Sequence, residues 1–543
     1  MKLPMILFVT IGMLGAAGLT PVNLRVESEA NPVGVSASPR FAWNLSGEGR
    51  GGMQKGYELL AASSLEKLTP DSADLWKSKM DKSSQRSLLA WQGSKLKENQ
   101  KVYWKVRVID QKGQIGEWSK VAYFTVGKDR KLGPAAQLAS FQSSSEVLNG
   151  IFKRNVATLK KRLDGYLQGD VSALGTGHQV QRSARDLIYL FESIPALNDW
   201  IGKVHAGQNK LGYFPGGPKQ MMAPVHSDAA IAVPHTLWWM SGDPSLVAGR
   251  WDQMEKHMVR REESDPTIQG ISWGAPLKFK NSPSTEFIDL CYFGMTSRLM
   301  YELAAPASKP NNSIRYRDYS ARIRRSFKKQ YLAEEGQLKI PGQSAAVLAL
   351  RSSVMDAATR QPVIDSLLKD LGGIKDVGNL SAKPLLPVLS LTGNQQKAFE
   401  LVSDSKSPWA DPARKDFEAS GVVEWMMSTL AGIDTRTPGF RQFHVSPNIP
   451  EGDTLTWVKS SYRAPSGEIK VHWEKKEKAL HVKCTVPNGA LAIITLPLKE
   501  GEKISEGGKT VKESFGAEIM KKDSVQGMVS IIAQAGTYHF VID

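Results

Sequence analysis

The sequence predicts three folded parts: a β-sandwich, a domain built only of α-helices, and a second β-sandwich. Three observations lead to this prediction. At 543 residues the chain is too long for one hydrophobic core. The spacing of apolar residues changes from alternation to three-and-four spacing and then back to alternation. Hydrophobic residues make up 41% and charged residues 23%, which is typical of globular proteins and excludes a disordered chain.

Residues 1–20 have the pattern of a secretory signal peptide. Lys2 is followed by an apolar run from Pro4 to Leu14 and then by small residues. The run is too short to span a bilayer, and a retained membrane tether is the alternative to cleavage. No later apolar run is long enough to cross a membrane. We therefore expect a secreted or periplasmic protein with no stable membrane insertion once the signal is removed.

Residues 21–128 predict the first β-sandwich. Short alternating runs such as "FAWNL", "YELLAAS", "KVYWKVRVID" and "VAYFTVG" are separated by turn residues at near-regular spacing. Because successive side chains of a strand point to opposite faces, "KVYWKVRVID" places its basic residues on one face. The other face receives four apolar side chains: Val102, Trp104, Val106 and Val108.

Residues 135–435 change to helical spacing. Segments such as "EVLNGIFKRNVATLKKRL", "RSARDLIYLFESIPAL" and "FIDLCYFGMTSRLMYELAA" carry apolar residues three and four apart. Gly, Pro and Asn separate about a dozen such segments, with no strand-like run between them. The pattern predicts stacked helical hairpins. A superhelical repeat is the alternative, although the sequence has no repeat of fixed period.

Residues 436–543 return to strand spacing. The runs "LTWVKSSYRAPSGEIKVHWE", "ALHVKCTVPNGALAIITLP" and "GTYHFVID" alternate in hydrophobicity, and "APSG" and "VPNG" are turn signals within them. We therefore expect a second antiparallel β-sandwich at the C-terminal end of the sequence.

The formal net charge is +16, since 70 Lys and Arg outnumber 54 Asp and Glu. The basic residues are spread in short clusters with no long basic arm, so nucleic acid is not an expected partner. An acidic polysaccharide is at least as good a partner for such a chain, and a merely solvated surface is the simplest explanation.

The cysteines exclude a disulfide framework and a cysteine-based metal cluster. Only Cys291 and Cys484 are present, and they fall in different predicted domains. Both are expected to be buried, unpaired thiols. The sequence also contains no nucleotide-binding fingerprint, P-loop, HExxH motif or metal-spaced cluster, so we predict no cofactor and no metal.

Two terminal motifs resemble a known family. "PVNLRVESEANPVGVSASPRFAWNL" with "YWKVRVIDQKGQIGEWS" looks like the N-terminal fibronectin-like domain of bacterial α-L-rhamnosidases of glycoside hydrolase family 78. "AGIDTRTPGFRQFHVSPNIPEGDTLTWVKSSYRAPSGEIKVHW" is similar to that family's C-terminal sandwich. The resemblance implies a fibronectin type III or immunoglobulin-like sandwich and a central (α/α)6 toroid. The family's extra carbohydrate-binding β domains have no counterpart.

The stretch "DGYLQGDVSALGTGHQ", residues 164–179, is similar to the start of the family's barrel. The family pattern there is approximately D-C-P-Q-R-D-E-R-L-G-W-T-G-D. Asp164, Gln168 and Asp170 match its two Asp and its Gln, and the late Thr-Gly pair is kept. The resemblance implies that Asp164 contacts the sugar. Ordinary turn chemistry before a glycine is the alternative role of that side chain.

The departures from the family pattern fall where the chemistry takes place. Val171 replaces the Glu that serves as general acid, Gly169 replaces the Arg, and His178 replaces the final Asp. The family's second catalytic Glu has no clear counterpart, because the segment around "SPWADPARKDFEASGVVEW" is too short to hold it. The family mechanism therefore cannot be transferred residue by residue.

Three carboxylates remain as candidate catalytic groups: Asp170, Asp228 and Glu286. An inverting glycosidase needs one carboxylic acid to protonate the leaving oxygen and one carboxylate to activate water. Asp170 lies in a glycine-containing loop and is the first choice, with helix capping or an arginine pair as the alternative. N-capping is the alternative for Asp228, and a capping-box role is the alternative for Glu286.

Two histidines add a second possible chemistry. His178 and His226 can titrate near neutral pH and act as acid or base, although a lone histidine is more often structural. Acting with Tyr213, Lys219 and Arg185, His226 could supply the base, acid and cation of a β-elimination from a uronic acid. Polysaccharide lyases do occur on (α/α) toroids, so a lyase remains an alternative.

Aromatic side chains are candidates for sugar stacking. Tyr213, Trp273 and Trp409 are expected to bind substrate, the two tryptophans because they fall in loops. The consecutive Trp238 and Trp239 lie in an apolar helix and are expected to be mainly core, with at most one ring facing the cleft.

The leading hypothesis from these residues is a glycoside hydrolase resembling an α-L-rhamnosidase. Its expected substrate is a rhamnose-containing or related plant or algal polysaccharide or oligosaccharide. The alternatives are a catalytically impaired carbohydrate-binding protein and the toroid lyase.

Overall fold

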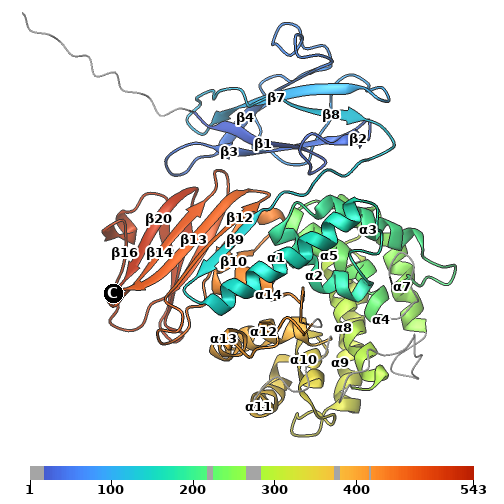
Figure 1. The fold of residues 1–543 in the computed structure, drawn as a ribbon, viewed down its shortest axis with the longest axis vertical. Helices are drawn as coiled ribbons and strands as arrows, with labels where there is room; N and C mark the ends of the chain where they lie inside the picture. Colours follow the sequence, from blue (N-terminus) through green and yellow to red (C-terminus); the bar gives the residue numbers. More distant parts are fainter. Residues whose placement is uncertain (1–17, 217–223, 264–282, 372–379, 415–416) are drawn as a thin grey trace, which may run out of the picture. The chain divides into compact units, whose positions relative to one another are not determined.

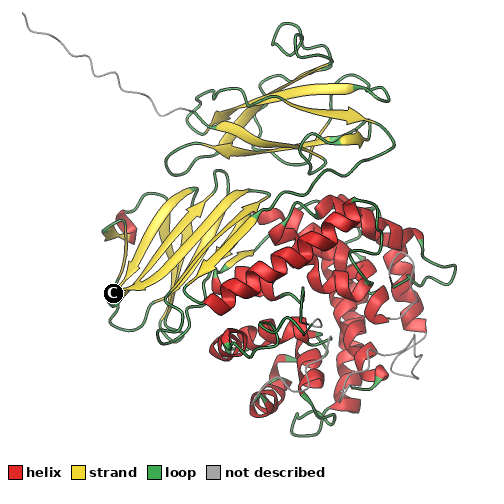
Figure 2. Ribbon diagram, viewed as in Figure 1, coloured by secondary structure: helices red, strands yellow, loops and turns green. Residues whose placement is uncertain are grey.

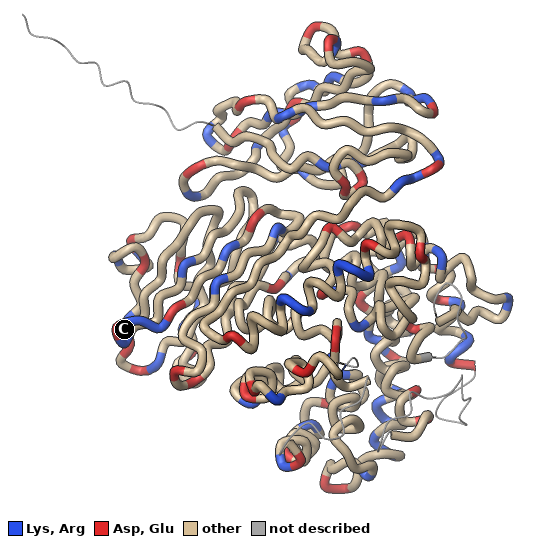
Figure 3. The backbone as a smooth tube through the Cα atoms, in the orientation of Figure 1, with Lys and Arg blue, Asp and Glu red and all other residues tan. Residues whose placement is uncertain are grey.

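The computed structural model describes residues 18–216, 224–263, 283–371, 380–414 and 417–543. The predicted signal peptide falls almost wholly outside these residues, and Trp273 falls wholly outside them. The chain divides into two compact units, Met1–Arg130 with Gln534–Gly536, and Lys131–Ala533 with Thr537–Asp543. Lys and Arg are interspersed with Asp and Glu along both units (Figure 3). Within the described ranges, no helix has the length and hydropathy to cross a bilayer.

The first unit consists of two β-sheets with a core of its own (Figure 2). The sheets have the strand orders β1-β3-β6 and β2-β8-β7-β4-β5. The alternation predicted for β7 (Lys101–Asp110) is confirmed, because Val102, Trp104, Val106 and Val108 are all fully buried. The remaining strands of this unit are β1 (Thr20–Val26), β2 (Val33–Val35), β3 (Arg40–Ser46), β4 (Gln54–Ala62), β5 (Trp76–Lys77), β6 (Leu89–Ala90) and β8 (Ala122–Val126).

The helical part of the second unit is a closed ring of helix pairs (Figure 1). Six inner helices pack in the circular order α2, α5, α8, α10, α12, α14 and back to α2, which confirms the predicted (α/α)6 toroid. The inner helices are α2 (Gly177–Leu190), α5 (Ala229–Ser241), α8 (Thr285–Leu303), α10 (Gln343–Arg351), α12 (Ala382–Leu391) and α14 (Val422–Trp425), the last continuing as a π-helical turn, Met426–Leu430.

The outer helices alternate with the inner ones along the chain. They are α1 (Glu146–Leu167), α3 (Ile194–Ala206), α7 (Trp251–Glu263), α9 (Asn312–Tyr331), α11 (Gln361–Asp370) and α13 (Gln395–Ser403). Short helical turns join some of them: α4 (Pro224–Ser227), α6 (Ser245–Ala248) and the 3-10 turn Ala357–Thr359.

The C-terminal part of the second unit consists of two sheets, as predicted, but it is not wholly antiparallel, because residues 442–445 pair parallel with residues 491–494. The five-stranded sheet has the order β10-β11-β15-β19-β18, and the seven-stranded sheet has the order β17-β16-β20-β14-β13-β12-β9. The strands from β10 onward are β10 (Ile433–Thr435), β11 (Gln442–Val445), β12 (Trp457–Ala464), β13 (Gly467–Lys476), β14 (Ala479–Val486), β15 (Leu491–Pro497), β16 (Ile504–Glu506), β17 (Lys509–Thr510), β18 (Ala517–Asp523), β19 (Met528–Ala533) and β20 (Gly536–Ile542). Two 3-10 turns lie between them, Pro438–Phe440 and Val511–Glu513.

Two strands lie within residues 135–435, where the sequence predicted only helices. One is β10, at the end of that segment, and the other is β9. β9 (Ala139–Ser143) pairs antiparallel with β12, at the edge of the seven-stranded sheet. Its five residues alternate between buried and exposed, with Phe141 on the buried face. The run is too short to be recognised from the sequence. It ties the start of the helical part to the C-terminal sheets.

Hydrogen bonds also join two inner helices, α2 and the continuation of α14, to the C-terminal sheets. The Tyr189 hydroxyl donates to the carbonyl of Ile433 (2.9 Å), and the Trp473 indole Nε1 donates to the carbonyl of Leu430 (2.8 Å). Both cysteines are buried and unpaired, as predicted.

Candidate functional site

A cavity of about 590 Å³ lies among the inner helices of the ring. Its lining combines basic, acidic and aromatic side chains from all six inner helices. The charged and aromatic members are His178, Arg182, Arg185, His235, Trp238, Trp239, Tyr292, Arg298, Glu302, Arg351, Lys383 and Glu424. Glu302 and Glu424 are the two carboxylates that the described part of the chain contributes to this lining.

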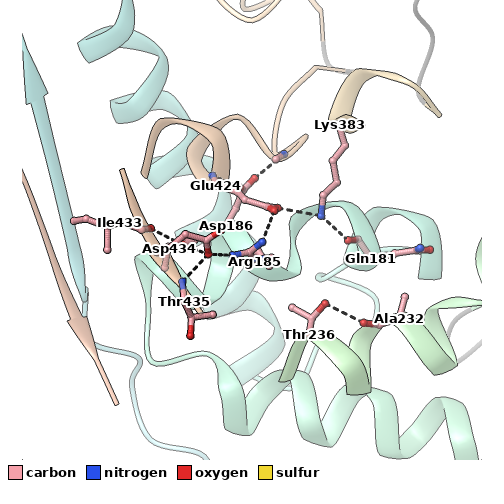
Figure 4. Close-up of polar contacts among 12 residues, drawn as sticks. Gln181, Arg185, Asp186, Ala232, Thr236, Lys383, Glu424, Ile433, Asp434 and Thr435 are labelled. Carbon is pink, nitrogen blue, oxygen red and sulfur yellow. Dashed lines mark hydrogen bonds and ion pairs between the residues drawn. The ribbon is translucent and has the colours of Figure 1, made fainter. Parts of the chain in front are cut away.

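Glu424 is fixed by contacts to its main chain and to its side chain (Figure 4). Gly421, which precedes α14 with a φ of 80°, donates its N–H to Asp186, and the Glu424 N–H does the same (2.8 and 2.7 Å). The Glu424 carboxylate then accepts from Arg185 (2.9 Å) and pairs with Lys383 (3.2 Å). Burial would raise its pKa, but the charges of Lys383, Arg185 and Arg351 lower it to about 2.

Glu302 uses both of its carboxylate oxygens in a similar way. Oε1 accepts from Arg298 (2.6 Å), one turn earlier on α8, and Oε2 lies 2.7 Å from Nε2 of His235 on α5. Burial would raise the pKa of Glu302, but the hydrogen bond from His235 and the charge of Arg298 lower it. Both cavity carboxylates are therefore held in the ionised form.

Helix α5 supplies an aromatic wall. Trp238 and Trp239 meet edge to face (5.7 Å between ring centres), and the Trp239 ring is parallel to the His235 ring (6.2 Å). Both indoles line the cavity, so the expectation that at most one ring faces the cleft is wrong. The sequence could not reveal this, because α5 is apolar on nearly all sides and has no clear hydrophobic face.

His178 lies in the cavity lining and close to His226. Their rings meet edge to face at 6.2 Å, although His226, on α4, is not part of the lining. Burial lowers the pKa of His226, and its Nδ1 has no hydrogen-bond partner among the described residues. The close approach depends on Gly177, because a Cβ at that position would lie 2.0 Å from the His226 carbonyl oxygen.

Asp170, Asp164 and Glu286 lie outside the cavity lining. Asp170 is exposed in the loop after the outer helix α1, where its Oδ1 accepts from the N–H and hydroxyl of Ser172 (2.9 and 2.6 Å). Asp164 pairs with Lys160 on the surface of α1 (2.5 Å). Glu286 is exposed in the first turn of α8, and Ser284 is the residue that caps this helix. The geometry therefore gives no support to the roles predicted for these three carboxylates.

Asp228 is fully buried but also lies outside the lining. Its carboxylate contacts Arg261 (2.5 Å) and His257 (3.2 Å), and it makes no side-chain capping bond to α5. The N-capping alternative is therefore wrong, and the geometry favours a structural ion pair over a catalytic group. Arg261 also donates to the carbonyl of Asp289 (3.1 Å), which links α7 to α8.

The predicted stacking residues are packed away from the cavity. Tyr213 is 5% exposed, with its ring near His257 and the Arg260 guanidinium. Trp409 is 4% exposed and packs edge to face on Phe417 (5.1 Å). Neither ring belongs to the cavity lining, and Trp273 lies outside the described residues.

Four charged lining residues were not predicted from the sequence: Glu302, Arg351, Lys383 and Glu424. One signal was available in "VVEWMM", where a single carboxylate interrupts an apolar helix. Burying an unpaired charge is costly, so such a residue implies a cationic partner elsewhere in the chain. That partner cannot be identified from sequence spacing, since Arg185 and Lys383 are distant along the chain. Within the described ranges, no group of three His, Cys, Asp or Glu side chains could hold a metal ion.

Comparison with protein families gives three matches along the chain. Residues 21–129 match the Rha78A-like N-terminal immunoglobulin domain, and residues 432–511 match the bacterial α-L-rhamnosidase C-terminal domain. Between them, residues 136–413 match the bacterial α-L-rhamnosidase 6 hairpin glycosidase domain, which covers just over half of the chain.

Individual relatives agree with these matches. An α-L-rhamnosidase of Streptomyces avermitilis is 24% identical over 65% of this chain, but the match spans only 38% of that relative. An α-L-rhamnosidase of Formosa agariphila is 39% identical over 19% of this chain and 11% of its own length. The structure of an α-L-rhamnosidase from Dictyoglumus thermophilum has the same fold, with a TM-score of 0.84, 14% identity and coverage of 97% of this chain and 100% of that one.

The family match therefore covers five of the six inner helices of the ring and most of the cavity lining, and it ends before α14 and Glu424. The chain belongs to the family of bacterial α-L-rhamnosidase six-hairpin glycosidase domains.

Proposed function

We propose that this protein is a glycoside hydrolase that cleaves α-L-rhamnosyl linkages in rhamnose-containing saccharides, within the central cavity of the helical ring. The observation that carries the proposal is the family match over most of the segment that encloses this cavity. The cavity volume of about 590 Å³ is within the usual range for small-ligand sites. Trp238 and Trp239 offer the flat apolar faces on which sugar rings stack.

The proposed reaction is acid/base hydrolysis. Glu424, which stays ionised at neutral pH, takes a proton from the attacking water as the water oxygen bonds to the anomeric carbon. The hydrogen-bonded pair of His235 and Glu302 supplies a proton to the departing glycosidic oxygen, with the imidazole as the proton donor and Glu302 holding its ring in place. Attack by water with departure on the opposite face inverts the anomeric configuration.

We propose plant or algal polysaccharides, or oligosaccharides derived from them, as the natural substrates, and an exported location. Support for the substrate comes from the family of rhamnosidases to which the chain belongs. Support for export comes from the apolar run after Lys2. Fractionation of cells that express the full chain tests the location.

The test of the function is release of free L-rhamnose by the full-length protein. Neutral p-nitrophenyl α-L-rhamnoside and rhamnosyl oligosaccharides are the substrates, and proton NMR of the first product gives its anomeric configuration. We expect free rhamnose with inverted configuration. Saccharide binding with no release of rhamnose would contradict the proposal and indicate a binding protein. Rising absorbance near 235 nm on uronic-acid polymers would contradict it in favour of a lyase.

A further inference from the structure

The central cavity carries more positive charge than the carboxylates around it can neutralise. Its lining in the described part of the chain includes two carboxylates, Glu302 and Glu424. Asp434 lies just outside the lining and pairs with one lining arginine, Arg185 (2.6 Å). Against these three acids stand five basic lining side chains: Arg182, Arg185, Arg298, Arg351 and Lys383.

The cavity carboxylates are already engaged. Glu424 is shared by Arg185 (2.9 Å) and Lys383 (3.2 Å), as Figure 4 shows. Glu302 is shared by Arg298 (2.6 Å) and His235 (2.7 Å). Oε2 of Glu424 lies within ion-pair distance of Lys383 but accepts no hydrogen bond from the described residues, and neither carboxylate bonds directly to Arg351.

Arg182 donates to the carbonyl of Glu418, whereas Arg351 is a basic lining side chain without a direct bond to any of these acids. It ends the inner helix α10, lines the cavity and is exposed within it. Among the described residues, no side chain or carbonyl accepts a hydrogen bond from it or forms an ion pair with it. Loss of hydration and the neighbouring charges of Arg298 and Arg185 lower the pKa of Arg351, while the charges of Glu424 and Glu302 act in the opposite direction without fully offsetting them. An arginine nevertheless stays charged at neutral pH, so this cation faces the cavity with the nearby charges of Glu424 and Glu302 but with no directly bonded acceptor among the described residues.

We propose that the cavity selects saccharides in which the rhamnosyl group is linked to a residue bearing an anionic group, and that Arg351 binds that group. The anion is either the carboxylate of a uronic acid or a sulfate ester. The planar guanidinium can contact two oxygens of either group at once. A neutral sugar hydroxyl would leave the charge uncompensated, so the cavity discriminates by charge. The inference rests on the proposed function in one respect, namely that the rhamnosyl group binds in this cavity.

The test is equilibrium binding of sulfur-linked disaccharides, which resist hydrolysis, to the full-length protein by calorimetry. Three probes differ only at C6 of the second sugar: α-L-rhamnosyl glucose, the corresponding glucuronate, and the corresponding glucose 6-sulfate. We expect one or both anionic probes to bind at least about tenfold more tightly than the neutral one. The ranking of glucuronate against sulfate identifies the source of the anion.

Two variants assign the preference to Arg351. Arg351→Gln is expected to remove most of the preference, and Arg351→Lys to keep part of it. Arg317→Gln is the matched control, because Arg317 lies on the outer helix α9 with its side chain 67% exposed. It should keep the preference in full. Equal binding of the neutral and both anionic probes would overturn the inference, as would an unchanged preference in Arg351→Gln.

Failure of this inference and failure of the proposed function are distinguishable. Hydrolysis of neutral rhamnosides without any anionic preference overturns the inference and leaves the proposed function standing. An anionic preference that depends on Arg351, in a protein that releases no rhamnose, supports the inference and overturns the proposed function.

Discussion

Asp186 and Glu424 are neighbouring carboxyl groups whose pKa values are shifted in opposite directions. Burial raises the pKa of Asp186 to about 7, and the charge of Glu424 adds to this effect. Lys383, Arg185 and Arg351 outweigh burial at Glu424 and lower its pKa to about 2. Such divergence between neighbouring acids is characteristic of functional sites, although structural ion pairs also produce it. Asp186 positions the helix start, and Glu424 faces the cavity.

The low pKa of Glu424 predicts how its contribution to stability depends on pH. Because the folded-state pKa lies below the usual 4.5, the stabilisation is present in full above that value and is lost as the pH falls toward 2. Glu424→Gln should therefore lower the free energy of unfolding by about 3–5 kcal/mol at pH 7, where Arg185 and Lys383 lose their partner. The gap to the wild type should shrink markedly at pH 3.

Urea denaturation at the two pH values measures this gap. Glu286→Gln is the control, because Glu286 is exposed in the first turn of α8. It should change the free energy of unfolding by less than about 0.5 kcal/mol. A Glu424→Gln deficit of equal size at both pH values would contradict the assignment of the stabilisation to the ionised carboxylate.

Asp228 and Asp164 offer a second comparison at the level of single residues. Asp228→Asn leaves the buried Arg261 without its carboxylate and should cost about 3–5 kcal/mol. Asp164→Asn breaks a half-exposed pair with Lys160 and should cost less than about 1 kcal/mol. Thermal and urea unfolding measure both. Similar losses in the free energy of unfolding for the two variants would show that burial of the Asp228 ion pair does not determine how much it stabilises the fold.

At the level of elements, the approach of α2 to α4 depends on one glycine. A Cβ at Gly177 would lie 2.0 Å from the His226 carbonyl oxygen, so Gly177→Ala must push the two segments apart. We expect a loss of about 1–3 kcal/mol in stability, as in overpacked cores, and a displaced His178. Gly202→Ala on α3 is the control, since the nearest atom to its Cβ would be Arg250 Nη2 at 3.8 Å.

The control variant should be neutral or slightly more stable, because alanine favours a helix more than glycine does. Differential scanning calorimetry measures the melting temperatures of both variants for comparison with the wild type. If Gly177→Ala melts at the wild-type temperature, the close approach of α2 to α4 is not a constraint on the folded state.

The elements also show what the sequence could and could not predict. Alternation over ten residues predicted the buried face of β7 correctly, because a long strand gives a strong period-two signal. β9 was missed because five residues carry too weak a signal, and its partner β12 lies some 320 residues further along the chain. The exposure of both indoles of α5 was missed because that helix has no single apolar face.

At the level of the whole molecule, closure of the helical ring brings side chains that are distant in the sequence into contact. The fold class followed from periodicity and from the family resemblance. The resemblance also directed attention to the loop around Asp170, which follows an outer helix and whose Asp170 is exposed and outside the cavity lining. In the cavity, Glu424 contacts Arg185 and Lys383, and the three residues come from three different inner helices. The spacing of residues along the sequence does not predict these contacts.

The two units and β9 give a prediction about truncation. The first unit has a separate hydrophobic core, so a chain starting at Lys131 should keep the cooperative unfolding of the second unit. A chain starting at Ser145 also lacks β9, which leaves β12 without its neighbour and removes Phe141 from its contact with Phe152. It should melt several degrees lower in calorimetry. Equal melting temperatures would mean that β9 does not stabilise the ring.

The central claim is that the chemistry takes place in the cavity of the ring and not in the exposed loop after α1. The most direct test compares initial rates of L-rhamnose release by the wild type, Glu424→Gln and Asp170→Asn, each shown to be folded at the assay temperature. We predict a loss of at least about 100-fold for Glu424→Gln and a change of less than about twofold for Asp170→Asn. Loss of activity in Asp170→Asn with normal rates in Glu424→Gln would contradict the account.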